Sequence, residues 1–132
     1  MIAIDTNVLV RILVEDPDAP EQCQQARNLV LSASEPVWIA QIVLVEAVWV
    51  LESCYRFQKS AIVNVIERIS SHPALQLEAA ERIENALALY QDHTVDFADC
   101  LILTAATQRR LILHTFDRKL ARLNGVQRIM PA

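Results

Sequence analysis

Hydrophobic residues follow two patterns along this chain: short unbroken runs, and longer stretches in which apolar positions recur every three or four residues. The short runs, bounded by proline or polar residues, are typical of buried strands, and the longer stretches predict helices. We expect strands at residues 1–5, 37–40, 75–77, 111–115 and 126–129. We expect helices at residues 6–14, 20–33, 41–56, 60–70, 79–91, 96–110 and 117–123.

This alternation of strands and helices predicts the α/β class, with a parallel sheet of about five strands in a three-layer α/β/α arrangement. The chain shows no repeat and no linker, so we expect one domain over residues 1–132. A hydrophobic content of 53% with 21% charged residues excludes a disordered chain. Gly125 is the only glycine, which excludes the glycine-rich phosphate loops of P-loop and dinucleotide-binding proteins.

The apolar pattern also predicts which side chains are buried. Helix 20–33 should turn Ala26, Leu29 and Val30 toward the core, and helix 41–56 is apolar nearly all round, so it should be buried. The three cysteines should be small buried hydrophobes in a reducing cytosol rather than disulfide partners or zinc ligands. They are Cys23, Cys54 and Cys100.

Neither the N-terminus nor the longest apolar stretch points to a membrane. The N-terminus does not resemble a signal peptide, because it lacks a basic segment and a cleavage site of small residues. The apolar stretch at residues 37–51 is too short to cross a bilayer and is interrupted by Gln41 and Glu46. We therefore expect a cytoplasmic protein that does not associate with membranes.

Three carboxylates stand alone inside strongly apolar runs. Asp5 ends the apolar run that opens the chain, Glu46 is the only polar residue in 42–51, and Asp99 lies among apolar residues of helix 96–110. A buried charge requires an ion pair or a metal, and no basic residue lies beside Asp5 or Glu46 in the sequence. We therefore expect these acids to converge in space around a divalent cation.

The predicted topology gives the acids a common location. Ligands of parallel α/β sheets bind beyond the carboxyl ends of the strands, and Asp5 and Asp117 each follow such an end. Asp99 lies in the first turn of a helix that Asp96 is positioned to cap. Four acids are thus expected at one edge of the sheet: Asp5, Glu46, Asp99 and Asp117. Carboxylate oxygens alone suit Mg²⁺ or Mn²⁺, which would activate a water molecule for attack on phosphorus.

The net charge of −4 is unevenly distributed. Residues 1–99 hold fifteen of the sixteen acids and six of the twelve basic residues, a balance of −9. Residues 100–132 hold the remaining acid and the other six basic residues, a balance of +5. A basic segment beside an acidic cluster suits a phosphodiester substrate, although an ordinary solvated surface would explain the same asymmetry.

Four segments taken in order resemble the PIN domain, and in length and order the VapC-type toxins of bacterial toxin–antitoxin pairs. They are Asp5-Thr6-Asn7 after a strand, Glu46 in an apolar helix, Asp96 to Ile102, and Thr115-Phe116-Asp117. The resemblance covers nearly the whole chain and implies an endoribonuclease that cleaves single-stranded RNA and depends on Mg²⁺ or Mn²⁺. It also implies a homodimer, held inactive by a small VapB-like antitoxin whose tail enters the catalytic groove.

The resemblance assigns roles to individual residues. Asp5 and Asp99 match the principal metal-binding aspartates, and Glu46 and Asp117 match the other two acids of the site. Three more positions match residues that orient these acids or the water by hydrogen bonds: Thr6, Asn7 and Thr115. Gln41 departs from the family pattern, because many members have Ser or Thr at this helix start, so we expect no side-chain cap there.

Other interpretations remain open. The chain could be a catalytically silent PIN module that binds RNA or a protein partner. A phosphatase with Asp5 as nucleophile would require an acid at position 7, where Asn7 stands, and a receiver-like switch would require an acid paired with Asp5.

Structural alternatives apply to single residues: Glu46 could pair with Arg11 or Arg56, Asp96 and Asp117 could open helices, and Trp38 and Trp49 could be core or dimer contacts. His72, His93 and His114 share no metal-like spacing, so we assign no general-base histidine.

Overall fold

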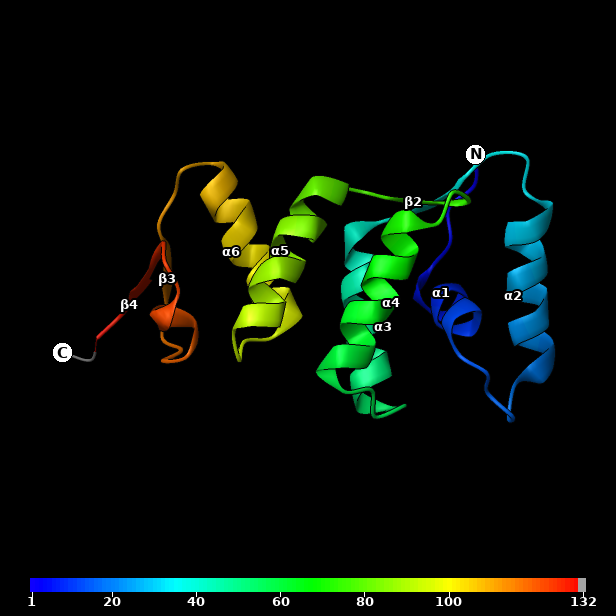
Figure 1. The fold of residues 1–132 in the computed structure, drawn as a ribbon, viewed down its shortest axis with the longest axis horizontal. Helices are drawn as coiled ribbons and strands as arrows, with labels where there is room; N and C mark the ends of the chain where they lie inside the picture. Colours follow the sequence, from blue (N-terminus) through cyan, green and yellow to red (C-terminus); the bar gives the residue numbers. More distant parts are fainter. Residues whose placement is uncertain (131–132) are drawn as a thin grey trace. The chain divides into compact units, whose positions relative to one another are not determined.

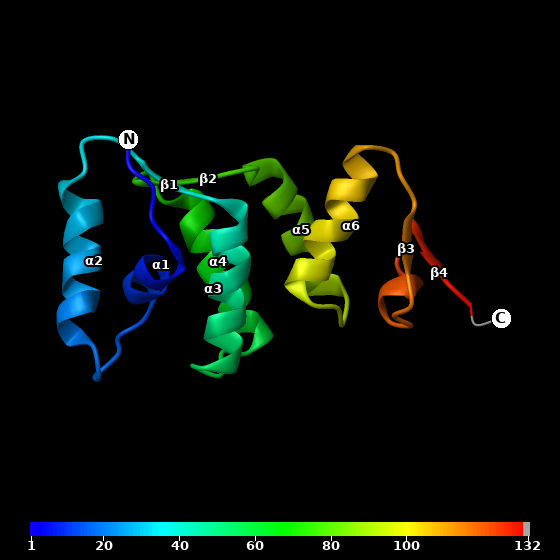
Figure 2. The same cartoon turned by 180° about the vertical axis from the view of Figure 1, so that it is seen from behind.

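The computed structural model describes residues 1–130, and its internal contacts divide the chain into two compact units. The first unit is Met1–Ala80 and the second begins at Glu81 (Figure 1 and Figure 2). The last two residues of the domain predicted over 1–132 lie outside the described part. No helix in the described part is long and apolar enough to cross a membrane.

The first unit contains four helices and two strands. In chain order these are α1 (Thr6–Leu13), α2 (Pro20–Ser32), β1 (Val37–Ile39), α3 (Gln41–Ser53), α4 (Lys59–Ser71) and β2 (Leu75–Leu77). Helix α1 packs against both α2 and α3, and α4 packs against β2. The core of this unit is built from fully buried aliphatic side chains of α1, β1, α3 and α4, among them Leu9, Ile39, Leu51 and Ile66.

Strand β1 is the central extended segment of the first unit. On one side it pairs in parallel with β2, with Trp38 opposite Gln76. On the other side Trp38 N donates to Ile2 O at 2.8 Å and Ile4 N donates to Trp38 O at 3.3 Å. The predicted strand 1–5 is therefore parallel as expected but is reduced to a bridge at Ala3, because the chain turns into α1 at Thr6.

The second unit contains two helices, two strands and a single 3₁₀ turn. These are α5 (Ala80–Asp92), α6 (Phe97–Gln108), β3 (Leu113–Thr115), the 3₁₀ helix η1 (Leu120–Arg122) and β4 (Val126–Arg128). Strands β3 and β4 are parallel, with Thr115 opposite Arg128. The rings of Tyr90 and Phe97 meet edge to face at 5.7 Å, which packs the end of α5 against the start of α6.

The predicted order of helices and strands is observed, except that residues 1–5 form only a bridge, and every strand pairing within residues 1–130 is parallel, which confirms the α/β class. The strands form two parallel pairs, β1 with β2 and β3 with β4. The predicted helix 117–123 is reduced to η1. Helix α2 buries Cys23, Ala26 and Val30, which follow one another at steps of three and four residues. Leu29 lies beside this buried face and is exposed, so the prediction that Leu29 is buried is wrong.

Helix α3 is less buried than its apolar sequence predicted. Ile42 is 63% exposed and Trp49 is 65% exposed, so Trp49 is not a core residue. Because α3 is apolar on all sides, its hydrophobic pattern does not reveal which side faces the core. Cys23 and Cys100 are buried as predicted, whereas Cys54, which follows the last residue of α3, is exposed.

Candidate active site

Asp5 is the N-cap residue of α1. Its side chain accepts a hydrogen bond from Val8 N at 3.0 Å, which satisfies one of the unpaired N–H groups at the helix start. The residue is exposed, so the expectation that Asp5 is buried in an apolar environment is wrong. The apolar run before it belongs to the paired segment, and Asp5 itself lies where that segment ends and the helix begins.

Glu46 is held by a hydrogen bond from another helix. Thr6 Oγ1 donates to Glu46 Oε1 at 2.9 Å, which connects the first residue of α1 to the middle of α3. Glu46 is exposed, so its expected burial is also wrong. It lies four residues after Ile42 and three before Trp49, so these three side chains share the exposed face of α3.

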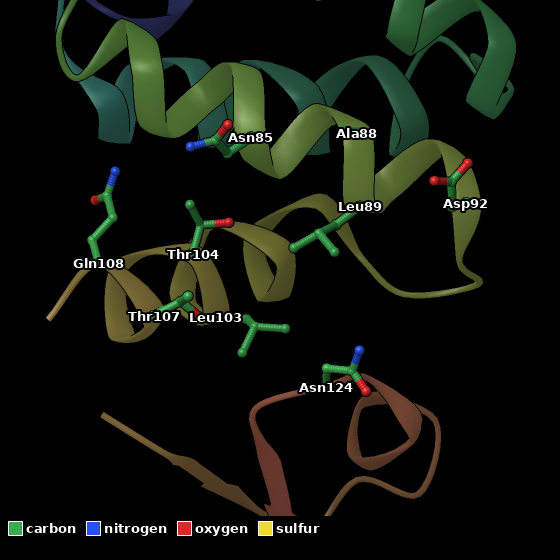
Figure 3. Close-up of a pocket in the computed structure, with 9 residues that line it drawn as sticks. All are labelled: Asn85, Ala88, Leu89, Asp92, Leu103, Thr104, Thr107, Gln108 and Asn124. Atoms are coloured by element: carbon green, nitrogen blue, oxygen red, sulfur yellow. The ribbon is translucent and has the colours of Figure 1, made fainter. Parts of the chain in front are cut away.

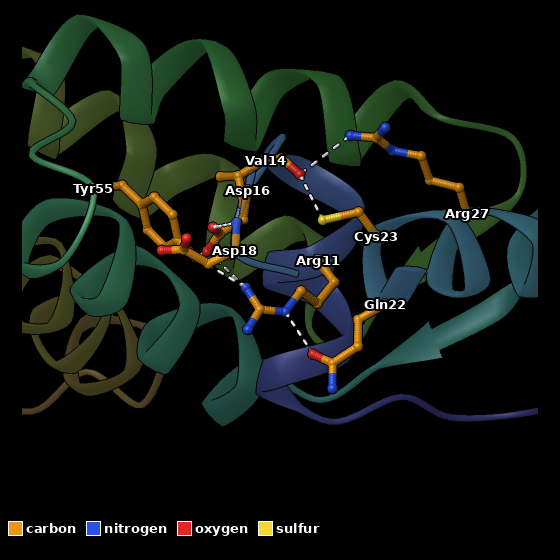
Figure 4. Close-up of polar contacts among 8 residues, drawn as sticks. All are labelled: Arg11, Val14, Asp16, Asp18, Gln22, Cys23, Arg27 and Tyr55. Atoms are coloured by element: carbon orange, nitrogen blue, oxygen red, sulfur yellow. Dashed lines mark hydrogen bonds and ion pairs between the residues drawn. The ribbon is translucent and has the colours of Figure 1, made fainter. Parts of the chain in front are cut away.

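A polar cluster fixes the other ends of the same two helices (Figure 4). Arg11 Nη1, near the end of α1, lies 3.1 Å from Asp16 Oδ2 and donates to Tyr55 OH at 3.0 Å. Tyr55, two residues after α3, donates to the same Asp16 oxygen at 2.8 Å. Arg11 is therefore committed to Asp16, and Glu46 forms no ion pair in the part of the chain that the structure describes.

This cluster shifts the ionisation of its members. The Tyr55 hydroxyl, the backbone N–H of Asp18 and the Arg11 guanidinium hold the pKa of Asp16 below 3.8, against the opposing effect of burial. The hydrogen bond that the Tyr55 hydroxyl donates to Asp16 raises the pKa of Tyr55, and burial raises it further. Asp16 is therefore ionised and Tyr55 is protonated at neutral pH, the states in which the three side chains attract one another.

Asp99 lies in the first turn of α6 and is partly buried. Burial raises the pKa of its carboxyl above 3.8, and the charges of Asp96 and Asp117 raise it further. These three acids of the second unit are thus close enough for their charges to repel. Even so, no three His, Cys, Asp or Glu side chains among residues 1–130 are grouped closely enough to hold one metal ion.

Asp96 occupies the N-cap position of α6, but its carboxylate accepts no capping hydrogen bond. The prediction that its side chain caps the helix is therefore wrong. The backbone oxygen of Asp96 accepts the first helical hydrogen bond, from Cys100 N at 3.0 Å. The carboxylate is exposed, and its charge is one of those that raise the pKa of Asp99.

Asp117 and Thr115 form the turn that follows β3. Asp117 N donates to Thr115 Oγ1 at 3.0 Å. The Asp117 carboxylate in turn accepts from Lys119 N at 2.8 Å and Leu120 N at 3.0 Å, which begins η1 as an acid at a helix start does. Thr115 therefore fixes the backbone of the acid that follows it, whereas Asn7, near the start of α1, is exposed and its side chain makes no hydrogen bond within residues 1–130.

The structure thus places the four candidate acids in pairs, one in each unit. Asp5 and Glu46 lie in the first unit, linked through the Thr6 hydroxyl to one helix start. Asp99 and Asp117 lie in the second unit, linked through the electrostatic effect on Asp99. All four side chains carry carboxylate oxygens, which are the donor atoms that Mg²⁺ and Mn²⁺ prefer.

Sequence reasoning missed one residue that organises this region. Glu78 Oε1 accepts a hydrogen bond from Gln41 N at 2.9 Å, so a carboxylate after β2 satisfies the start of α3. The side chain of Gln41 itself does not cap the helix. The position of Glu78, one residue after the predicted strand 75–77, was the signal that could have identified it.

A model of the PIN domain family matches residues 2–126, so the chain belongs to the PIN domain family. A VapC ribonuclease of Aquifex aeolicus (strain VF5) is 28% identical over 101 residues, which is 76% of this chain and 75% of that protein.

Two solved structures are also similar. A toxin–antitoxin complex from Klebsiella pneumoniae has 18% identity over 96% of each chain, with a TM-score of 0.41. VapC20 of Mycobacterium tuberculosis, a toxin that cleaves the sarcin–ricin loop, has 18% identity over 92% of this chain and 94% of its own, with a TM-score of 0.45.

Proposed function

We propose that this protein is an endoribonuclease that hydrolyses phosphodiester bonds in single-stranded RNA and acts as the toxin of a toxin–antitoxin pair. The observation that carries the proposal is that a chain of the PIN domain family holds four acids in the order and setting in which it resembles the family's nucleases: Asp5, Glu46, Asp99 and Asp117. The similarity to a VapC ribonuclease over three quarters of the chain supports the same activity.

In this proposal Asp5 and Asp99 are the principal ligands of Mg²⁺ or Mn²⁺, and Glu46 and Asp117 complete the site. A bound divalent ion would supply positive charge and lower the pKa of the attacking water. The raised pKa of Asp99 supports this assignment, because a carboxylate that burial and like charges destabilise is one that a cation would stabilise. Thr6 orients Glu46, and Thr115 fixes the turn that carries Asp117.

The proposed partners are RNA as substrate, a second copy of the chain in a homodimer, and a small VapB-like antitoxin, all in the cytoplasm. The exposed side chains of Ile42 and Trp49 support association with another protein chain, since neighbouring large apolar side chains on a surface often mark a protein–protein interface.

Cleavage of RNA by the purified chain, free of antitoxin, tests the proposal. Total RNA is incubated at fixed salt with Mg²⁺, Mn²⁺ or EDTA, using the wild type, Asp5→Asn and Asp99→Asn. Asparagine is as good an N-cap as aspartate, so Asp5→Asn removes the charge and keeps the start of α1 intact. Glu67→Gln, at an exposed acid of α4, is the matched control.

Discrete cleavage that requires the metal and both aspartates, with Glu67→Gln fully active, is the expected result. Folded wild-type protein that binds RNA and cleaves none of it with either metal would instead favour the catalytically silent PIN module.

A further inference from the structure

A cavity of about 420 Å³ lies wholly within the second unit (Figure 3). Helix α5 contributes Asn85 and Leu89, and α6 contributes Leu103 and Thr107. Asn124 closes it from the segment before β4. Its volume is within the range of natural sites for small ligands, about 300–1,000 Å³. None of the residues assigned to the proposed metal site lines it.

The wall that carries Asn124 is fixed in position. Gly125 has a φ of +84°, and a Cβ there would lie 3.8 Å from Leu103 Cδ1 and 3.9 Å from Thr107 Oγ1, so the backbone runs close to α6. Gly125 O accepts a hydrogen bond from Leu113 N at 3.0 Å, and Leu123 is 5% exposed. Asn124 is therefore anchored on both sides, which prepares the cavity before any ligand binds.

The cavity presents amide groups that the fold does not use. The side chains of Asn85 and Asn124 form no hydrogen bond within residues 1–130, and they approach the cavity from opposite walls in Figure 3. Gln108 accepts from Arg82 Nε at 2.8 Å through its oxygen. The remaining walls are largely apolar, with Leu89 and Leu103 directed between the two asparagines.

The charge of the lining excludes one class of ligand. No lysine or arginine lines the cavity, and its one ionisable residue is Asp92. A phosphate or another anion would therefore be repelled. Amides among apolar walls instead suit a neutral planar heterocycle, because a single Asn or Gln amide can form two hydrogen bonds with the edge of a nucleobase.

We propose that this cavity binds one unpaired nucleobase, through the amides of Asn85 and Asn124. The proposal rests on the ribonuclease function proposed above, since the base would belong to the RNA substrate. Asp99, Leu103 and Thr107 follow one another at steps of four residues, so they lie along one face of α6. One such step is about 6 Å along the helix, which places the bound base close to the carboxylate assigned to cleavage. The cavity would thereby select the nucleotide next to the cut.

Binding without cleavage is measured first, by NMR titration of the full chain in EDTA with each free nucleoside and with short single-stranded oligoribonucleotides. Shifts of the side-chain amide signals of Asn85 and Asn124 are expected. Asn85→Ala and Asn124→Ala should each weaken binding about tenfold or more, the factor expected for a lost paired contact to a base. Asn64→Ala, at an exposed asparagine of α4, is the matched control and should bind normally.

The two sources of a base give different results. Oligonucleotides that bind more tightly than nucleosides support a base of the RNA substrate, whereas equal affinities support a free nucleoside as the ligand of the same chemistry and overturn the RNA source. The absence of amide shifts with either ligand, or equal losses in Asn64→Ala, overturns the cavity proposal.

Cleavage of an RNA pool of random sequence separates this inference from the function on which it rests. Asn85→Ala and Asn124→Ala should change the base preference at one position beside the cut, and Asp99→Asn should abolish cleavage of every sequence. If both variants cleave RNA with the same base preference as the wild type, the base-binding proposal for the cavity is overturned, and the proposed nuclease function is not affected. Base binding without any wild-type cleavage overturns the nuclease and leaves the base-binding cavity.

Discussion

The two units hold their candidate acids in different ways. In the first unit, hydrogen bonds from Val8 N and the Thr6 hydroxyl satisfy Asp5 and Glu46, and both acids are exposed. In the second unit, Asp99 is partly buried and is repelled by Asp96 and Asp117. Both acids of the first unit are therefore positioned by hydrogen bonds, whereas Asp99 of the second unit carries an electrostatic cost that a cation would relieve. Variants that remove a charge, a hydrogen bond or a repulsion test this difference.

The largest expected effect is the loss of RNA cleavage on removal of charge in either unit. Asp5→Asn and Asp99→Asn should each reduce kcat by about 10³-fold, because a ligand worth about 4 kcal/mol of barrier stabilisation corresponds to that factor. The melting temperature of Asp5→Asn should be unchanged, since the cap is retained. Single-turnover cleavage and thermal melting are measured on the same preparations, and a variant that retains wild-type kcat would remove its residue from the proposed site.

A smaller loss is expected when the hydrogen bond that holds Glu46 is removed. Thr6→Ala should lower kcat by about 10–100-fold with little change in KM, since groups that orient a metal ligand have effects of this size. Thr6→Ser keeps the hydroxyl and should restore most of the rate. The steady-state kinetics of the two variants are compared with the wild type. Equal losses in both variants would show that Thr6 acts through packing rather than through its hydroxyl.

The cluster at the far ends of α1 and α3 should affect stability more than activity. Asp16→Asn and Tyr55→Phe should each lower the melting temperature by about 2–5 °C at pH 7, because each leaves a polar partner of Arg11 unsatisfied. The pKa of Asp16 is lowered in the folded state, so its contribution is present above pH 3.8 and is lost as the pH falls through the folded pKa.

Thermal melting at pH 7 and at the lowest pH at which the wild type remains folded tests the Asp16 contribution. The difference between wild type and Asp16→Asn should be smaller at the lower pH, because the wild-type carboxyl becomes protonated as the pH falls through its folded pKa. Arg68→Gln, at an exposed residue of α4, is a control that should show no such pH dependence. A difference of the same size at both values would mean that the charge of Asp16 does not stabilise the fold.

The order and type of the helices and strands could be predicted because each repeats one period for several residues, as in α4, where Ile62, Ile66 and Ile69 are buried. Burial of the acids could not be predicted in the same way. Glu46 lies in an apolar run but on the exposed face of α3. Because α3 is apolar on all sides, its sequence does not show which side faces the core. Partners distant in sequence, such as Thr6 with Glu46 and Glu78 with Gln41, depend on packing that no local pattern records.

The smallest effect tests the electrostatic cost in the second unit. Because the pKa of Asp99 is raised, the folded protein binds a proton more tightly than the unfolded chain, and the ionised carboxylate destabilises the fold at neutral pH. Asp99→Asn should therefore raise the melting temperature of metal-free protein by about 1–3 °C at pH 7, a modest change since the group is only partly buried. This gain should shrink as the pH falls through the folded pKa of Asp99.

The same substitution in the first unit gives the contrast. Asp5→Asn should bring no such gain, because the carboxylate that it replaces is exposed and satisfied by Val8 N. Addition of Mg²⁺ should raise the melting temperature of the wild type more than that of Asp99→Asn, since only a protein that binds the ion is stabilised by it. If Asp99→Asn and Asp5→Asn melted alike in EDTA and in Mg²⁺, the two units would hold their acids in the same way, and the repulsion at Asp99 would have no measurable cost.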